Sequence, residues 1–312
     1  MLRKSDLSSC LGLELAPTRK QSGTGRSDPS EDPLISPDEA QRVLKSAGLF
    51  GTARTIAFIN LKGGTGKTTS AVTTATRASD FGFRAVVLDL DAQASATFML
   101  APGEIDQVKP FIEIWDKPTQ ISDVLIEVSP WLSLLPSSLD NSLLDIHLSK
   151  PLSQKTAIKD ACSHMHAMGH DLVVIDCPPS LGAGVISAIC ASDTLVIPTT
   201  PDNFSLRGID LTIEETGAIA ETFGLPRPQI KILLTHYDRR IKLSDAVYRH
   251  LQEKYSDMLI EQPIRISSAY AQAQEQGKTV FQFAKAKKVR ADYHALTTEL
   301  LRLNGSAPNT DS

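Results

Sequence analysis

The residues best suited to chemistry lie in one continuous stretch, Asn60–Thr69, which is rich in glycine, lysine and threonine. This stretch follows the apolar run Ile56–Ile59 and precedes a segment without proline or glycine before Gly82. A strand, a glycine-rich loop and a helix N-terminus in this order form a phosphate cradle, because loop N–H groups and the helix dipole point at the anion. The residues expected to bind a nucleotide are Lys62, Gly63, Gly64, Thr65, Gly66, Lys67, Thr68 and Thr69.

Individual residues of this loop suit particular roles in binding a nucleotide. Gly63, Gly64 and Gly66 permit turns with positive φ, which a side chain would obstruct. Lys67 is placed to reach the β- and γ-phosphates, and the hydroxyl of Thr68 is placed to ligate Mg²⁺. The loop therefore predicts binding of a nucleoside triphosphate together with Mg²⁺.

Three aspartates follow apolar runs and supply the acids that a hydrolytic site needs. Asp89 and Asp91 follow the run Ala85–Leu88, and Asp176 follows Leu172–Ile175. The carboxyl ends of parallel strands converge on one crevice, so these acids are expected to meet beside the phosphates. Mg²⁺ usually keeps several waters and takes one or two carboxylates. Asp176 is the best candidate for the acid that holds the metal through water, and Asp89 is expected to support the metal shell.

The loop also carries a family resemblance. The order Lys-Gly-Gly-Thr-Gly-Lys-Thr-Thr at Lys62–Thr69 resembles the deviant Walker A motif of the ParA/MinD superfamily of dimerising ATPases, with Leu61 where the general P-loop has glycine. The resemblance implies ATP and Mg²⁺ as cofactors and a homodimer that forms on ATP binding. It also implies that Lys62 crosses the dimer to the partner's phosphates, as a catalytic cation beside Lys67.

Further segments extend this resemblance to about residues 54–303. Asp89–Gln93 resembles the motif Asp-x-Asp-Pro-Gln, with Ala92 in place of proline, and the family role of orienting the attacking water falls on Asp91. Asp176–Ser180 resembles the Asp-x-Pro-Pro segment that senses the γ-phosphate. Leu234–Arg240 resembles a segment of chromosomal and plasmid ParA proteins.

DNA binding is implied by the same group of proteins, through basic residues and without sequence preference. The expected contacts are Arg239, Arg240, Lys242 and Lys288. A net charge of −4 provides no global attraction, so such a surface must be local. The acidic residues Asp210, Glu214 and Glu215 stand where some relatives place a DNA-contacting arginine, which weakens the transfer of individual roles.

Several functions remain open at this level. The leading one is segregation of plasmid or chromosomal DNA over the nucleoid of the cytoplasm, with slow ATP hydrolysis stimulated by a ParB-like partner. An alternative is positioning of a protein cargo through an adaptor. A membrane-cycling ATPase of the MinD type is disfavoured, because Leu300–Asn304 leads into a polar tail rather than a basic amphipathic helix. A regulatory nucleotide switch with low turnover is disfavoured by Asp91, and an iron–sulfur reductase by the wide spacing of the cysteines.

Strands and helices alternate from Thr55 onward, which predicts an α/β fold: a mainly parallel twisted sheet with helices on both faces, of the P-loop NTPase type. Expected strands are 56–59, 85–88, 131–135, 172–176, 194–198, 230–235 and 258–264. Expected helices are 153–168, 205–223, 243–255 and 289–303, with another near 121–128.

The expected organisation is a single ATPase domain over residues 51–304. A disordered arm is expected at 1–33, a short amphipathic helix at 34–50 and a polar tail at 305–312. The helix is expected to begin after Ser36, and it remains open whether it docks on its own domain or on a second protomer. The content of 41% hydrophobic and 22% charged residues is ordinary for a globular protein. No run of about 18 apolar residues occurs, so no membrane span is expected.

Overall fold

The computed structural model describes residues 2–11, 32–103, 109–276, 279–283 and 286–303. Within them, seven strands form one sheet in the order β5-β6-β4-β7-β3-β8-β9. Neighbouring strands are parallel except at the edge, where β5 and β6 are antiparallel. The strands are β3 (Arg54–Phe58), β4 (Ala85–Asp89), β5 (Ile126–Ser129), β6 (Leu132–Leu135), β7 (Leu172–Asp176), β8 (Thr194–Thr199) and β9 (Gln229–Leu234). The predicted α/β fold is confirmed.

Strand β3 lies between β7 and β8, so the loop that follows it leaves from the middle of the sheet. Its residues, and Ile59 directly after it, alternate between two cores: Ile56 and Phe58 pack into one, and Ala57 and Ile59 into the other. A strand that is covered on both faces reads as a continuous apolar run, which is why the sequence revealed it.

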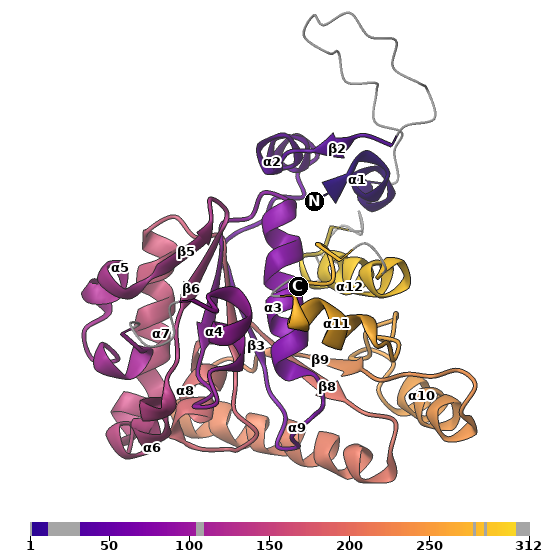
Figure 1. Ribbon diagram of the computed structural model, residues 1–312. Helices are drawn as coiled ribbons and strands as arrows, with labels where there is room; N and C mark the ends of the chain where they lie inside the picture. Colours follow the sequence, from indigo (N-terminus) through magenta and orange to yellow (C-terminus); the bar gives the residue numbers. More distant parts are fainter. Residues whose placement is uncertain (1, 12–31, 104–108, 277–278, 284–285, 304–312) are drawn as a thin grey trace, which may run out of the picture.

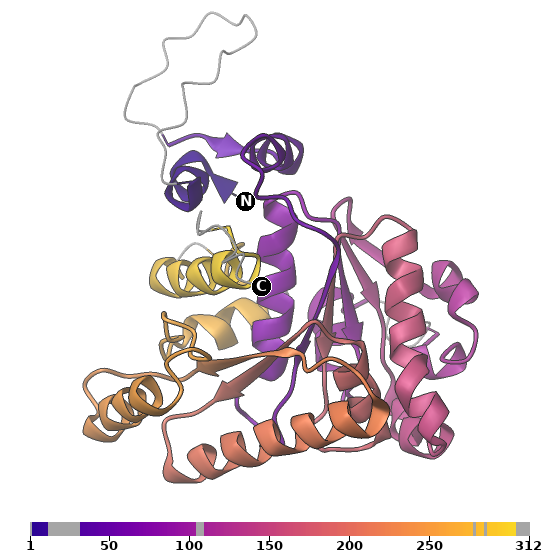
Figure 2. The same cartoon turned by 180° about the vertical axis from the view of Figure 1, so that it is seen from behind.

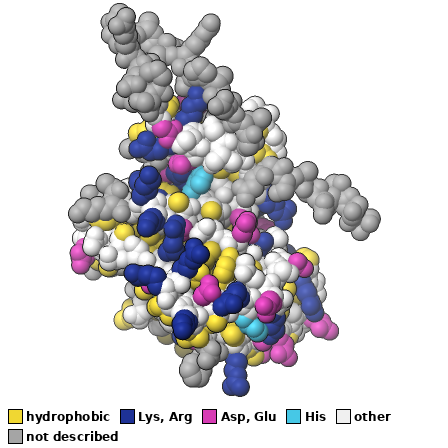
Figure 3. Space-filling model, turned by 90° about the vertical axis from the view of Figure 1, so that its right-hand side faces the viewer, with side chains coloured by type: hydrophobic (Ala, Val, Ile, Leu, Met, Phe, Trp, Pro, Cys, Tyr) yellow, Lys and Arg dark blue, Asp and Glu magenta, His cyan; other side chains and the backbone are white. Residues whose placement is uncertain are grey.

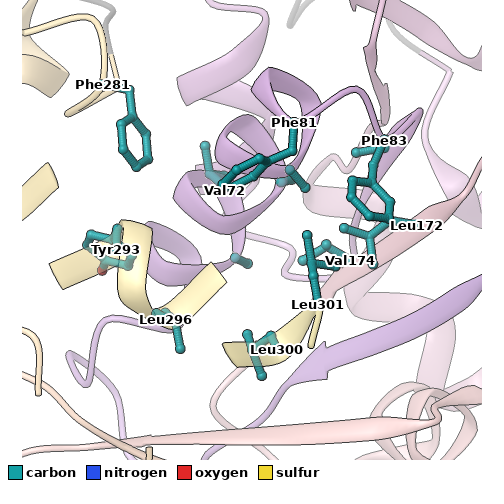
Figure 4. Close-up of a cluster of buried hydrophobic side chains, with 14 of the residues drawn as sticks. Val72, Phe81, Phe83, Leu172, Val174, Phe281, Tyr293, Leu296, Leu300 and Leu301 are labelled. Carbon is teal, nitrogen blue, oxygen red and sulfur yellow. The ribbon is translucent and has the colours of Figure 1, made fainter. Parts of the chain in front are cut away.

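Helices cover both faces of the sheet (Figures 1 and 2). On one face, α3 (Lys67–Asp80), α11 (Ala269–Glu275) and α12 (Lys287–Leu300) share a core with the sheet. Figure 4 shows this core, to which Val72 of α3, Phe81 directly after α3 and Leu296 of α12 all belong. On the other face lie α7 (Pro151–Ala167), α8 (Ala183–Ala191), α9 (Asn203–Phe223) and α10 (Lys242–Lys254). Shorter helices are α4 (Ser95–Leu100), η1 (Phe111–Glu113), η2 (Pro118–Gln120), α5 (Ile121–Val124), η3 (Leu139–Leu143) and α6 (Leu144–His147).

The N-terminal segment differs from the disordered arm expected at 1–33. Strand β1 (Leu2–Arg3) pairs antiparallel with β2 (Leu34–Ile35), and helix α1 (Lys4–Leu11) follows β1. Leu2, Leu7 and Cys10 are buried in the same core as α3 and α12. The prediction is wrong for residues 2–11, because their order comes from contacts with distant residues that local composition does not reveal. Residues 12–31 of the expected arm and the tail 305–312 lie outside the described residues.

Helix α2 (Pro37–Ser46) begins where predicted, with Ser36 Oγ accepting a hydrogen bond from the Glu39 N–H at 3.3 Å. Its residues Ala40 and Leu44 are buried in the protein's own core, which answers the open question of where it docks. Gln41 Nε2 also donates to the carbonyl of Gly82, at 2.7 Å.

Two other expectations fit only in part. The helix expected near 121–128 ends at Val124, and the chain then forms the edge strand β5. The strand expected at 258–264 is reduced to an isolated bridge between Ile232 and Leu259. No helix among the described residues is long and apolar enough to cross a membrane.

Candidate functional site

The glycine loop connects the end of β3 to the start of α3. Gly64 and Gly66 have φ values of 72° and 84°, in the left-handed region that favours glycine. Gly63 does not share this conformation, so the expectation of a positive φ fails there. No side chain caps the N-terminus of α3, which begins at Lys67. The first N–H groups of the helix therefore remain suited to an anion.

The loop is held in place by a hydrogen bond within it and by another from the residue that follows β9. Lys67 is only 7% exposed, and its Nζ donates to the Lys62 carbonyl at 3.1 Å. Burial lowers the pKa of Lys67, and the Asp176 carboxylate acts in the opposite direction. From beyond β9, Thr235 Oγ1 lies 2.8 Å from the Thr65 carbonyl oxygen and 3.1 Å from that of Thr199. This threonine joins the loop to the ends of two further strands.

Asp176 ends β7 and is fully buried. Neither of its carboxylate oxygens has a hydrogen-bond partner among the described residues. Burial raises its pKa well above the usual value, as does the nearby Asp89, whereas Thr68 and Lys67 act to lower it. A buried carboxylate with unsatisfied oxygens, beside a threonine hydroxyl, has the chemistry that a hard cation such as Mg²⁺ requires. These residues therefore fit the predicted metal.

Asp89 ends β4, and its carboxylate is already engaged. Its Oδ2 accepts from the N–H and the hydroxyl of Thr97, each at 2.8 Å, and its Oδ1 accepts from the Asp91 N–H at 3.1 Å. Burial raises the pKa of Asp89 to about 6, and the bonds from Thr97 act to lower it. The carboxylate thus orders the turn that carries Asp91, and Asp176 is left as the acid with free oxygens.

Asp91 lies in that turn and is partly exposed. Its Oδ1 accepts from the Gln93 N–H at 3.0 Å, and its carbonyl oxygen accepts from the Ala94 N–H at 2.8 Å. The structure thus brings Asp89, Asp91 and Asp176 to the ends of neighbouring strands, since Asp89 is directly paired with Asp176.

Lys62 has partners within its own chain. Its Nζ donates to Asp202 Oδ2 at 2.6 Å and lies within 3.3 Å of Thr200 Oγ1 and 3.5 Å of Ser205 Oγ. These three residues lie between β8 and the first turn of α9. Asp202 Oδ1 also accepts from the Ser205 N–H at 3.0 Å, so this acid caps the helix as well. The sequence did not single out Asp202, because a lone aspartate before a helix is typical of a cap.

The expected DNA contacts come from two elements. Arg239, Arg240 and Lys242 are exposed in the loop before α10 and in its first turn, and Arg240 forms an ion pair with Asp238 at 2.8 Å. Lys288 is exposed in the first turn of α12.

Arg265 links these two groups of cations. It forms an isolated bridge with Tyr237, and its Nη2 donates to the Lys288 carbonyl at 3.0 Å. Figure 3, which views the molecule from this side, shows lysine and arginine side chains gathered over the face. Two groups that are separate in the sequence therefore lie on segments that Arg265 joins.

The comparisons with known proteins identify the family of the chain. The AAA domain family matches residues 53–232. The chain is 29% identical over 245 residues to the cell division protein PomZ of Myxococcus xanthus, covering 78% of this chain and 76% of PomZ. It is 29% identical over 223 residues to the chromosome partitioning protein ParA of Caulobacter vibrioides, covering 69% and 83%.

Solved structures share the fold. The McdA–ATP complex of Cyanothece has a TM-score of 0.71 at 19% identity, covering 81% of this chain and 98% of McdA. Cobyrinic acid a,c-diamide synthase of Mycobacterium smegmatis, with bound ADP and magnesium, has a TM-score of 0.68 at 24% identity, covering 80% and 95%. The family match spans more than half of the chain, and this protein therefore belongs to the AAA domain family, as a P-loop ATPase of the ParA/MinD type.

Proposed function

We propose that this protein binds ATP with Mg²⁺ at the Asn60–Thr69 loop and hydrolyses it slowly to ADP and phosphate. The observation that carries the proposal is Asp176, a fully buried carboxylate without a hydrogen-bond partner among the described residues. Lys67 and Thr68 supply the cation and the hydroxyl beside it. When bound, Mg²⁺ would neutralise charge on the phosphates, held by Thr68 and, through water, by Asp176.

Each further residue has a role in this proposal. Lys67 and the N–H groups of Gly63–Thr69 hold the phosphates and exclude water from them. Asp91 accepts a hydrogen bond from the attacking water and orients it. Asp89 keeps the Asp91 turn in place through its bonds to Thr97 and to the Asp91 N–H.

ATP binding is proposed to form a homodimer in which Lys62 reaches the phosphates of the partner. In the isolated chain Lys62 is paired with Asp202, so the ion pair must open when the dimer forms. The pair is partly exposed, with side chains 44% and 31% accessible, and such pairs contribute at most about 1 kcal/mol. In this proposal, the free energy gained from contacts with ATP and with a second protomer offsets the cost of opening the ion pair.

The dimer is proposed to bind DNA without sequence preference and to segregate plasmid or chromosomal DNA on the nucleoid. Support comes from the exposed cations Arg239, Arg240, Lys242 and Lys288, and from relatives named for chromosome partitioning. A ParB-like protein would stimulate hydrolysis and release the DNA. The second candidate is positioning of a protein cargo through an adaptor, which the relationship to a cell division protein supports.

The decisive measurement is DNA binding with ATP, with ADP and without nucleotide, across a series of salt concentrations. The proposal requires binding that depends on ATP and weakens steeply as salt rises. Binding to anionic lipid vesicles in place of DNA would favour a membrane-cycling protein of the MinD type, and the absence of both would favour a regulatory switch.

The Asp91→Ala variant tests the catalytic assignment. We expect it to bind ATP and dimerise like the natural protein, because Asp91 contacts water rather than phosphate, but to lose at least about a hundredfold in kcat. ATP turnover and the sedimentation of the ATP-bound protein measure the two properties separately. Normal turnover in this variant would move the catalytic role to another residue.

A further inference from the structure

Behind the turn that carries Asp91 lies a buried polar network outside the recognised motifs. Ser137 and Asn141 lie between β6 and the end of η3, and both are buried, as is Thr97 of α4. Ser137 Oγ donates to the carbonyl oxygen of Asp91 at 2.7 Å. Asn141 Nδ2 donates to Ser137 Oγ at 2.7 Å and lies 3.3 Å from the carbonyl oxygen of Asp89.

The network closes on itself. The Ser137 N–H donates to Thr97 Oγ1 at 2.9 Å, and Thr97 Oγ1 donates in turn to Asp89 Oδ2 at 2.8 Å. Asn141 Oδ1 accepts from the Ile112 N–H at 3.3 Å. Buried polar groups are costly unless they are satisfied, and a fully connected network holds its members in one arrangement.

We propose that Ser137 and Asn141 are positioning residues for hydrolysis, which set the location of Asp91 through its backbone. The hydroxyl of Ser137 provides the contact from outside the turn, and the amide of Asn141 fixes the direction in which that hydroxyl points. The inference rests on the proposed role of Asp91 and extends the hydrolytic site to a segment that contacts no phosphate.

The same segment reaches the start of α8, the helix that follows the loop after Asp176. Asp145 of α6 accepts at its Oδ1 from the Gly184 N–H at 3.2 Å, in the first turn of α8. No side chain of its own caps α8, so Asp145 serves that end from another helix. The stretch from Ser137 to Asp145 therefore contacts both the turn that carries Asp91 and the first turn of α8.

The test compares Ser137→Ala with a matched control, Ser187→Ala. Ser187 of α8 is also fully buried, and its hydroxyl accepts from the Ile158 N–H at 3.2 Å, away from Asp91. We measure kcat, the KM and Kd for ATP, and the thermal midpoint of all proteins. Small displacements of catalytic groups are costly, so Ser137→Ala is expected to lower kcat roughly tenfold or more with the Kd for ATP changed less than about twofold.

The control is expected to lower the thermal midpoint but to keep kcat within about twofold. Ser137→Cys keeps the shape and a weak donor, so its kcat should fall between those of the natural protein and Ser137→Ala. If Ser137→Ala does not unfold cooperatively, Ser137→Cys is judged by the same criteria against Ser187→Ala.

The outcomes separate this inference from the function on which it rests. Normal turnover in Asp91→Ala overturns the catalytic role of Asp91 and this inference with it. Loss of turnover in Asp91→Ala, together with an unchanged kcat in the Ser137 variants, overturns this inference alone. Equal losses of kcat in Ser137→Ala and Ser187→Ala, or a parallel loss of ATP affinity, also overturn it, because they would indicate a general structural effect.

Discussion

Lys67 and Asp176 lie at the carboxyl end of the sheet, where both side chains are buried. Burial raises the pKa of Asp176 and lowers the pKa of Lys67, and the attraction between the carboxylate and the ammonium opposes both shifts. Burial disfavours the charged form of each side chain, so the site lowers the free energy of unfolding as long as no ligand is bound. Buried titratable residues with shifted pKa values are typical of functional sites.

Replacing Lys67 with alanine is expected to abolish measurable ATP binding. The variant loses the cation that faces the phosphates, which corresponds to at least about a hundredfold in Kd. Titration with a fluorescent ATP analogue measures the affinity, with Lys159→Ala on the exposed side of α7 as the control. Undiminished affinity in Lys67→Ala would reject the assignment of the phosphate loop.

His294 provides a prediction for pH. Burial, and next the neighbouring Arg77, lower its pKa from 6.5 to about 4. Because the folded value lies below the unfolded one, the stability that the neutral ring provides is complete above pH 6.5 and is lost as the pH falls toward 4.

The variant His294→Gln keeps a neutral acceptor for Arg77 and removes this titration. Between pH 6.5 and 4 it is expected to lose less free energy of unfolding than the natural protein, by on the order of 2 kcal/mol. Urea unfolding at several pH values measures the difference. The exposed His250→Gln on α10 should follow the natural protein, and identical curves for all three would contradict the role of His294.

At the scale of elements, the N-terminal helix α1 is attached to the helix that carries the phosphate loop. Asp6 of α1 pairs with Arg77 Nη2 of α3 at 2.6 Å, and Arg77 is only 2% exposed. The guanidinium also pairs with Asp80 at 3.2 Å and lies over the rings of Phe81 and Phe281. Arg77 thus connects α1, α3 and the segment before α12.

Asp6→Ala tests this attachment. Loss of one partner of a buried guanidinium is expected to lower the free energy of unfolding by about 1–3 kcal/mol. Chemical denaturation measures the effect, and Asp245→Ala, which breaks the exposed pair with Arg249, is the control with an expected change within about 0.5 kcal/mol. Equal effects of the two substitutions would show that α1 contributes little.

Some elements of the structure could be predicted from the sequence, and others could not. Strands such as β3 and β7 were predictable because burial on both faces leaves an uninterrupted apolar run. The phosphate loop was predictable because its chemistry is local. Helix α1, the Lys62–Asp202 pair and the Ser137 network were not, since each depends on residues brought together from distant parts of the chain.

At the scale of the whole molecule, the group of exposed cations forms only after the chain has folded. Arg239 and Lys288 come from separate elements, and the contacts of Arg265 bring these elements together. In a protein with a net charge of −4, attraction of a polyanion would have to come from such a local group of cations.

If this group of cations binds DNA, Lys288→Ala should weaken ATP-dependent binding similarly for all sequences. The slope of log K against log salt concentration is expected to become shallower by about 1, as for the loss of one phosphate contact. Fluorescence anisotropy across a salt series measures the slope. Lys159→Ala should leave it unchanged, and a similar change in both variants would place DNA elsewhere.

The position of β3 in the sheet has a consequence for synthesis of the protein. Arg54 of β3 pairs with Leu172 of β7, and Ile56 pairs with Thr194 of β8, so both neighbours are made long after β3 itself. At about 5–20 residues per second, the apolar run of β3 waits on the order of ten seconds for its partners on the ribosome. During that interval its exposed apolar side chains are a binding site for chaperones. Nucleotide cannot assist folding then, because the strands that flank β3 have not yet been made. The part of the molecule that binds phosphate is thus made early and takes its working shape only after β8 has emerged.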